Sequence, residues 1–254
     1  MIERKKMQKK MSSALSRQQP DTRPVGKVWD IPLRLFHWLL MLAVIGAIAS
    51  GKTQNWFWHE KMGLTVLGLI GFRLIWGVVG TRYARFSSFR LMPRHVIDYI
   101  RSRLAGDKSH SPGHAPTGAW ATILLLAVLG GMASFGTMAH NDVLFEGPLA
   151  AIANGYGEGG FSDIATDWHN ALEPVMFAML AVHIVALLMY RIWLKINLVP
   201  AMITGGITGG ITDGDEEMSP KPFSKTHQIT GVILLLAMIA AAQCLGLIGE
   251  RYYF

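Results

Sequence analysis

The chain has 254 residues, of which 51% are hydrophobic and 16% are charged, and its formal net charge is +7. The apolar residues gather in runs of about 18 or more, which excludes a soluble protein with one large core and predicts membrane-spanning helices. The single cysteine, Cys244, excludes an internal disulfide and a structural cysteine–zinc cluster.

Residues 1–27 are polar and rich in Lys and Arg, which predicts a disordered basic tail. Between the second and third apolar runs, Pro93–Gly106 is amphipathic and predicts a short helix on the inner membrane surface. Residues 201–226 contain an Ile-Thr-Gly-Gly repeat, which is typical of a flexible linker. The five predicted membrane spans are Leu33–Ser50, His59–Gly80, Gly118–Met138, His169–Leu194 and Gln228–Gly249.

The charges are distributed unevenly along the chain. Lys and Arg are concentrated in the N-terminal tail and between the second and third spans, whereas His140–Trp168 has neither and carries five acidic residues. The positive-inside rule therefore predicts a cytoplasmic N-terminus, an acidic segment on the outer side and, after five crossings, a periplasmic C-terminus. The basic charge indicates this topology and contact with anionic lipid, not a nucleic-acid partner.

Four histidines occupy two depths of the predicted bundle. His169 and His183 are fourteen residues apart, so they share one helix face and differ by about 21 Å in height. His59 opens the second span on the outer side and His37 lies near the inner start of the first, so the topology pairs His59 with His169 and His37 with His183. Each histidine alone could simply bond a neighbouring helix. Together they suit two haems stacked across a bilayer, each iron held by two imidazoles.

Two arginines and one further histidine belong to this hypothesis. Arg73 follows His59 by fourteen residues, at the depth of the inner pair, where a haem propionate would be its anionic partner. Arg34 precedes His37 by one turn and could act in the same way. For both, the alternative is that the side chain reaches out to the inner interface. His140, at the end of the third span, is a weaker candidate for the outer pair, and His227 is expected to lie in solvent.

Several short motifs resemble the bacterial di-haem cytochrome b561 family, which includes the cytochrome b subunit of nickel–iron hydrogenases. They include Val28–Trp38, Phe72–Gly77, Gly113–Trp120, Glu146–Ala150 and Ala201–Gly205. The resemblance implies a four-helix haem-binding bundle that holds two haem b groups, with His37, His59, His169 and His183 as axial ligands. It also implies electron traffic between the quinone pool and a redox partner. The fifth span and the glycine-rich linker depart from the family pattern.

We therefore predict an all-α integral membrane protein of the bacterial inner membrane. Its parts are a basic tail (1–27), a four-helix di-haem domain (28–200), a linker (201–226) and an extra span with a short outer tail (227–254). The favoured function is electron transfer between quinol or quinone and a periplasmic redox protein, as a subunit of a respiratory oxidoreductase and not a stand-alone enzyme. The alternatives are a superoxide:quinone oxidoreductase, which the acidic outer segment disfavours, and a non-redox transporter.

Overall fold

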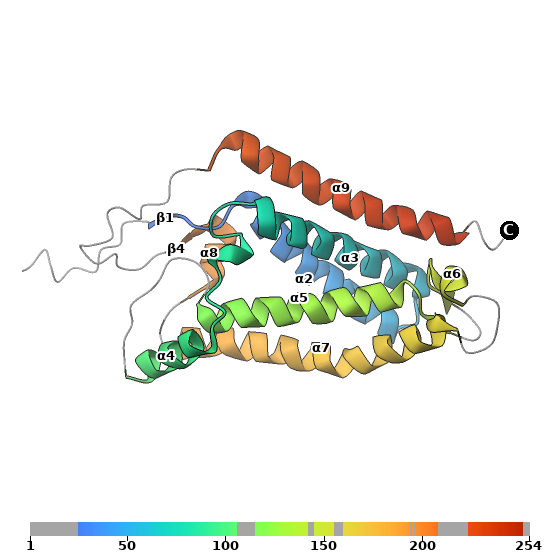
Figure 1. Ribbon diagram of the computed structural model, residues 1–254, viewed down its shortest axis with the longest axis horizontal. Coiled ribbons are helices and arrows are strands. Elements are labelled where there is room, and N and C mark those ends of the chain that lie inside the picture. Colours follow the sequence, from blue (N-terminus) through green and yellow to red (C-terminus); the bar gives the residue numbers. More distant parts are fainter. Residues whose placement is uncertain are drawn as a thin grey trace, which may run out of the picture.

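The computed structural model describes residues 25–105, 115–141, 145–154, 160–193, 195, 197–207 and 223–250. Most of the predicted basic tail, residues 208–222 of the linker and the C-terminal residues 251–254 lie outside this part. Five long helices run beside one another and make the fold all-α (Figure 1). They are α2 (Ile31–Lys52), α3 (Trp56–Val79), α5 (Pro116–Gly136), α7 (Phe161–Ile192) and α9 (Lys225–Glu250). Each is long and apolar enough to cross a membrane, which confirms the predicted membrane bundle.

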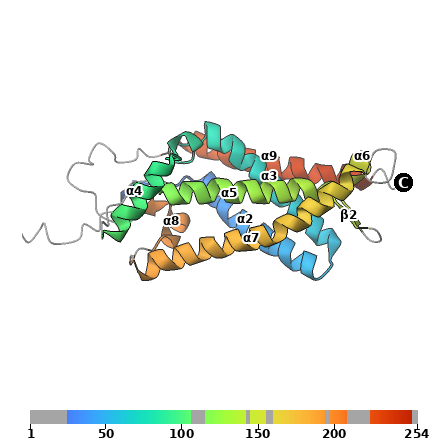
Figure 2. The same cartoon turned by 60° about the horizontal axis from the view of Figure 1, so that its bottom comes forward.

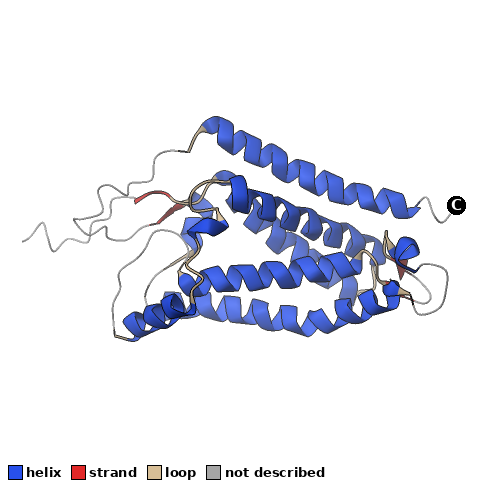
Figure 3. Cartoon of the chain, in the orientation of Figure 1, coloured by secondary structure: helices blue, strands red, loops and turns tan. Residues whose placement is uncertain are grey.

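Short elements close the two ends of the bundle (Figures 1 and 3). One end carries β1 (Val25–Lys27), η1 (Phe86–Ser88), α4 (Pro93–Leu104), α8 (Val199–Thr204) and β4 (Gly206–Ile207). The opposite end carries β2 (His140–Asn141), β3 (Phe145–Glu146) and α6 (Ala150–Asn154). The amphipathic helix α4 is where the sequence predicts one. The two small antiparallel ribbons, β1–β4 and β2–β3, are too short to be recognised from an alternating sequence pattern.

A buried carboxylate defines where α2 begins and fixes that point to the end of α3. Asp30 caps α2 by accepting a hydrogen bond from the Leu33 backbone N–H at 2.8 Å. Its other oxygen accepts from Trp76 Nε1 at 3.1 Å and from Thr81 Oγ1 at 2.6 Å. Asp30 is 1% exposed, so these donors compensate a charge that would otherwise be costly to bury.

The core lies mainly between α2 and α3. Phe36 and Phe72 have ring centroids 6.0 Å apart, and Phe72 stacks on Trp76 at 5.8 Å. Helix α7, by contrast, buries little of its surface in the protein and exposes large apolar side chains such as Ile184 and Leu188. Such a surface suits contact with lipid, which is the partner that the apolar spans predict.

Helix α7 is longer than the predicted fourth span. It begins at Phe161 instead of His169, so His169 lies two turns inside the helix. Its 32 residues would extend about 48 Å, more than the roughly 30 Å of a bilayer's hydrocarbon core. Hydropathy marks the apolar part of a helix but not its polar first turns, where acidic residues such as Asp163 are favoured. The helix contains Pro174 and bends along its length (Figure 2).

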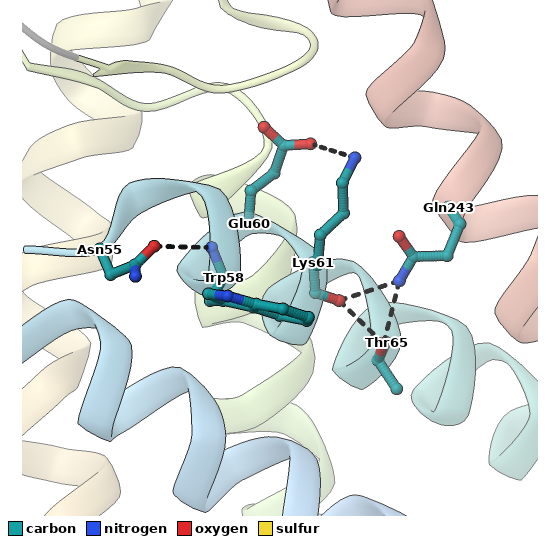
Figure 4. A network of polar contacts seen from close by, with 6 residues as sticks. All are labelled: Asn55, Trp58, Glu60, Lys61, Thr65 and Gln243. Carbon is teal, nitrogen blue, oxygen red and sulfur yellow. Dashed lines mark hydrogen bonds and ion pairs between the residues drawn. The ribbon is translucent and has the colours of Figure 1, made fainter.

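Helix α9 packs along α3, on the side of the bundle away from α7 (Figure 1). A Cβ added at Gly68 of α3 would lie 2.6 Å from the Met238 carbonyl oxygen, so the two backbones approach at a point where only glycine fits. Nearer the other end, Gln243 Nε2 donates to the Lys61 carbonyl and to Thr65 Oγ1, both at 2.9 Å (Figure 4).

The expectation that His227 lies in solvent is wrong, because its ring is half-buried and packs on Trp76 at 4.9 Å.

Candidate functional site

The structure brings His59 and His169 together. His59 lies in the first turn of α3 and His169 in α7, and their ring centroids are 6.0 Å apart with the ring planes at 88°. Two imidazoles that bind one iron from opposite sides, each at the roughly 2 Å typical of histidine–metal bonds, have centroids about 6 Å apart. The separation of this pair therefore fits one haem iron.

Each ring of this pair is also oriented by a backbone carbonyl of a neighbouring helix. His59 Nδ1 lies 2.9 Å from the Ala47 carbonyl oxygen, and His169 Nδ1 lies 2.8 Å from the Met132 carbonyl oxygen. A carbonyl can only accept a hydrogen bond, so each Nδ1 is the donor, and in the neutral ring this leaves the Nε2 lone pair for a metal. Such a bond to a backbone carbonyl is the usual support of a metal-binding imidazole.

The second predicted pair lies on α2 and α7, toward the other end of the bundle. His37 lies in the second turn of α2, and His183 follows His169 on α7. The two imidazoles are close enough to interact electrostatically. His37 Nδ1 is buried and has no hydrogen-bond partner among the described residues. His37 therefore lacks the carbonyl bond that orients the two outer rings.

Arg73 is buried at this inner end. The side chain is 1% exposed, so it does not reach out to the interface as the alternative interpretation required. Its guanidinium lies over the Phe86 ring at 4.4 Å, while Nη1 and Nη2 have no hydrogen-bond partner in the described part of the chain. The nearby carboxylate of Asp30 already accepts three other hydrogen bonds. A buried, unpaired guanidinium favours an anionic ligand, and a haem propionate has the required chemistry.

Arg34 has a contact that the sequence did not predict. Its Nη1 donates to the Ile203 carbonyl oxygen of α8, while its Nε is buried without a partner among the described residues. Trp38 Nε1 donates to the neighbouring Met202 carbonyl at 3.1 Å. These two residues of α2 therefore anchor α8. The buried Arg34 Nε is the donor that could bind a haem propionate.

His140, at the outer end of the bundle, bonds residues of α7 and is not part of the His59–His169 pair. Its Nδ1 lies 2.9 Å from Ser162 Oγ and its Nε2 lies 3.3 Å from Asp163 Oδ1. Its backbone N–H donates to Thr166 Oγ1 at 3.0 Å. With both ring nitrogens engaged by the first turns of α7, His140 holds the β2–β3 ribbon on that helix. No pattern in the sequence indicated these partners, because the ribbon itself was not predicted.

An ion pair links α2 to α7 close to the outer histidines. Lys52 Nζ lies 2.5 Å from Glu173 Oε1, and Glu173 is one turn after His169. The Lys52 side chain is 65% exposed, so the pair contributes little to stability and more to the alignment of the two helices.

An open cavity of about 770 Å³ lies between α3, α5 and α9. Its lining is almost entirely apolar, with Ser134 as a polar exception, and it includes none of the four histidines. Gly68 and Gly71 of α3 face α9 here, so they serve helix packing. This cavity is separate from the histidine pairs, which lie between α2, α3 and α7.

Comparison of the chain with known proteins identifies its family. The family model described as prokaryotic cytochrome b561 matches residues 28–205. Neither the curated proteins nor the solved structures contain a match to the chain. The matched region includes all four histidines with Arg34 and Arg73, and it ends before α9. The chain therefore belongs to the prokaryotic cytochrome b561 family and is a membrane b-type cytochrome that binds haem b and transfers electrons.

Proposed function

We propose that this protein carries two haem b groups and transfers electrons between the quinone pool and a periplasmic redox partner. In this role it is the electron-transfer subunit of a respiratory oxidoreductase in the bacterial inner membrane. The observation that carries the proposal is the His59–His169 pair, with its 6.0 Å centroid separation and its two carbonyl-bound Nδ1 atoms. A second pair, His37 on α2 and His183 on α7, supports a second haem.

Each part of the site has a defined task in this proposal. His59 and His169 would hold the outer haem, and His37 and His183 the inner one. Arg73 would bind a propionate of the inner haem, and Arg34 would assist from α2. A bound haem supplies an iron that gains and loses one electron, at a potential set by its ligands, its burial and nearby charge. The apolar surfaces of the helices keep water from the pairs.

The arrangement of the histidines supports electron transfer across the membrane. His169 and His183 are fourteen residues apart on α7, about 21 Å along its axis, so the two pairs lie toward opposite ends of the bundle. We place the end with α4 and α8 in the cytoplasm, following the charge distribution, and the end with α6 in the periplasm.

The periplasmic end offers an acidic surface to a partner. Glu146, Asp163 and Asp167 are exposed there, while Asp142 and Glu158 lie outside the described residues. Exposed carboxylates attract a basic protein and repel an anion such as superoxide. This surface therefore favours a protein partner over the superoxide:quinone oxidoreductase alternative.

The proposed function is tested by reducing the oxidised, detergent-purified protein with a soluble quinol and recording the haem bands. We expect both haem components to be reduced. We also expect His59→Ala and His169→Ala to deplete one spectral component, and His37→Ala and His183→Ala to deplete the other, because an iron that loses one imidazole holds a non-covalent haem weakly. Depletion of the same component by His59→Ala and His183→Ala would overturn the pairing, and haem that no quinol reduces would overturn the quinone role.

A further inference from the structure

The two outer histidines dock on their neighbouring helices in the same way. His59 of α3 bonds the Ala47 carbonyl of α2, and four residues after Ala47 comes Gly51. His169 of α7 bonds the Met132 carbonyl of α5, and four residues after Met132 comes Gly136. In an α-helix the carbonyl of one residue points toward the N–H of the residue four positions later, so each glycine lies directly beside the bond that the imidazole makes.

A side chain at either glycine would meet the imidazole. A Cβ added at Gly51 would lie 3.0 Å from His59 Nδ1 and 3.1 Å from its Cε1. A Cβ added at Gly136 would lie 3.0 Å from both His169 Nδ1 and Cε1. Each distance is shorter than an ordinary van der Waals contact, so the ring would have to move by a few tenths of an ångström.

Backbone conformation does not explain these glycines. Gly51 is the second-last residue of α2 and Gly136 the last residue of α5, and among the described glycines the left-handed conformation that favours glycine occurs at Gly205, with φ of 84°. The close approach of an imidazole at each position gives these two glycines a reason to be there, and the same arrangement occurs independently on two helix pairs.

We propose that Gly51 and Gly136 are positioning residues that open α2 and α5 to His59 and His169. They let each Nδ1–H reach a helix carbonyl, and this bond fixes the ring orientation and raises the basicity of Nε2. A more basic imidazole stabilises ferric over ferrous iron and so lowers the reduction potential. The inference rests on the proposed function, because the rings must be haem ligands for their basicity to affect a potential.

The test compares Gly51→Ala and Gly136→Ala with a matched control on each helix. Gly46→Ala in α2 would meet the flexible side chain of Met62, and Gly131→Ala in α5 would lie 3.5 Å from Leu172 Cδ1, an ordinary contact. The full-length, haem-loaded variants are titrated spectroelectrochemically, and the ferric proteins are examined by electron paramagnetic resonance. We expect Gly51→Ala and Gly136→Ala to raise the potential of one haem component and to shift its largest g value, while the other component and both controls keep the unsubstituted values.

The outcomes separate this inference from the proposed function. Unchanged potentials and g values in Gly51→Ala and Gly136→Ala, at full haem content, would overturn the inference alone, and so would equal shifts in the controls. Selective loss of one haem component in these variants, with the other component intact as evidence of a folded bundle, would support it. Absence of haem b from the unsubstituted protein would instead overturn the proposed function.

Discussion

His59 and His169 face each other across the bundle with their ring planes at 88°, although they belong to helices that are far apart in the sequence. Each ring is fixed by a different neighbouring helix, His59 by α2 and His169 by α5. The angle between the planes is therefore set by four helices at once. A rigid perpendicular pair has consequences that can be measured on the iron that it would hold.

We expect the outer haem to give a strongly anisotropic ferric low-spin signal. Parallel imidazole planes separate the energies of the two iron π orbitals, whereas perpendicular planes leave them nearly equal and so preserve a large orbital moment. Electron paramagnetic resonance of the oxidised protein checks this, with His59→Ala identifying the outer signal by its loss. A weakly anisotropic signal that disappears in His59→Ala would show that the rings do not keep the 88° arrangement when haem is bound.

Arg73→Gln should lower the potential of the inner haem or reduce its occupancy. The buried guanidinium would stabilise a haem propionate and the reduced iron beside it, and breaking a buried charge pair typically costs about 3–5 kcal/mol. Potentiometric titration of both components measures the effect. The exposed Arg82, changed to Gln, is the matched control and should leave both potentials unchanged. If Arg73→Gln shifted both components equally, or neither, Arg73 would not act through the inner haem.

Helix α9 should be dispensable for haem binding but not for stability. All four histidines precede it, and it lies on α3 away from α7 (Figure 1). A chain that ends after Thr212 should therefore keep both haem components at equal membrane insertion. It should unfold at lower temperature, because it loses the close packing at Gly68 and the two hydrogen bonds of Gln243. In the full-length chain, Gln243→Leu should have a smaller effect and lower the free energy of unfolding by about 1 kcal/mol. Loss of haem on truncation would contradict this account.

The acidic outer surface should control the rate of encounter with a basic partner. Asp167→Asn removes an exposed charge, and Asp163 is left unchanged because it also contacts His140. Stopped-flow electron exchange with a basic soluble cytochrome c should slow at low ionic strength. The difference should disappear at high salt, where exposed charges are screened, and the haem spectra should not change. An unaltered rate at low salt would place the docking surface elsewhere.

The histidine pairs could be predicted because helix periodicity and alternating topology are both visible in the sequence. Hydropathy likewise predicted the five spans and α4, although it missed the polar first turns of α7 and placed the start of that helix at His169 instead of Phe161. Contacts between distant helices left no such signal. The bond from Arg34 to Ile203, the engagement of His140 by Ser162, and the carbonyl partners beside Gly51 and Gly136 all depend on which helices become neighbours. For the same reason the sequence could identify α9 as a span without placing it against α3.

The number of haem groups per chain tests the central claim most directly. The pyridine haemochrome assay, divided by protein concentration from amino-acid analysis, gives this ratio for the purified full-length protein expressed with excess haem precursor. Two pairs of histidines at two depths predict a ratio of two haem b per chain. A ratio of one under these conditions, unchanged in His37→Ala and abolished in His59→Ala, would show that only the outer pair binds haem and would contradict the two-site account.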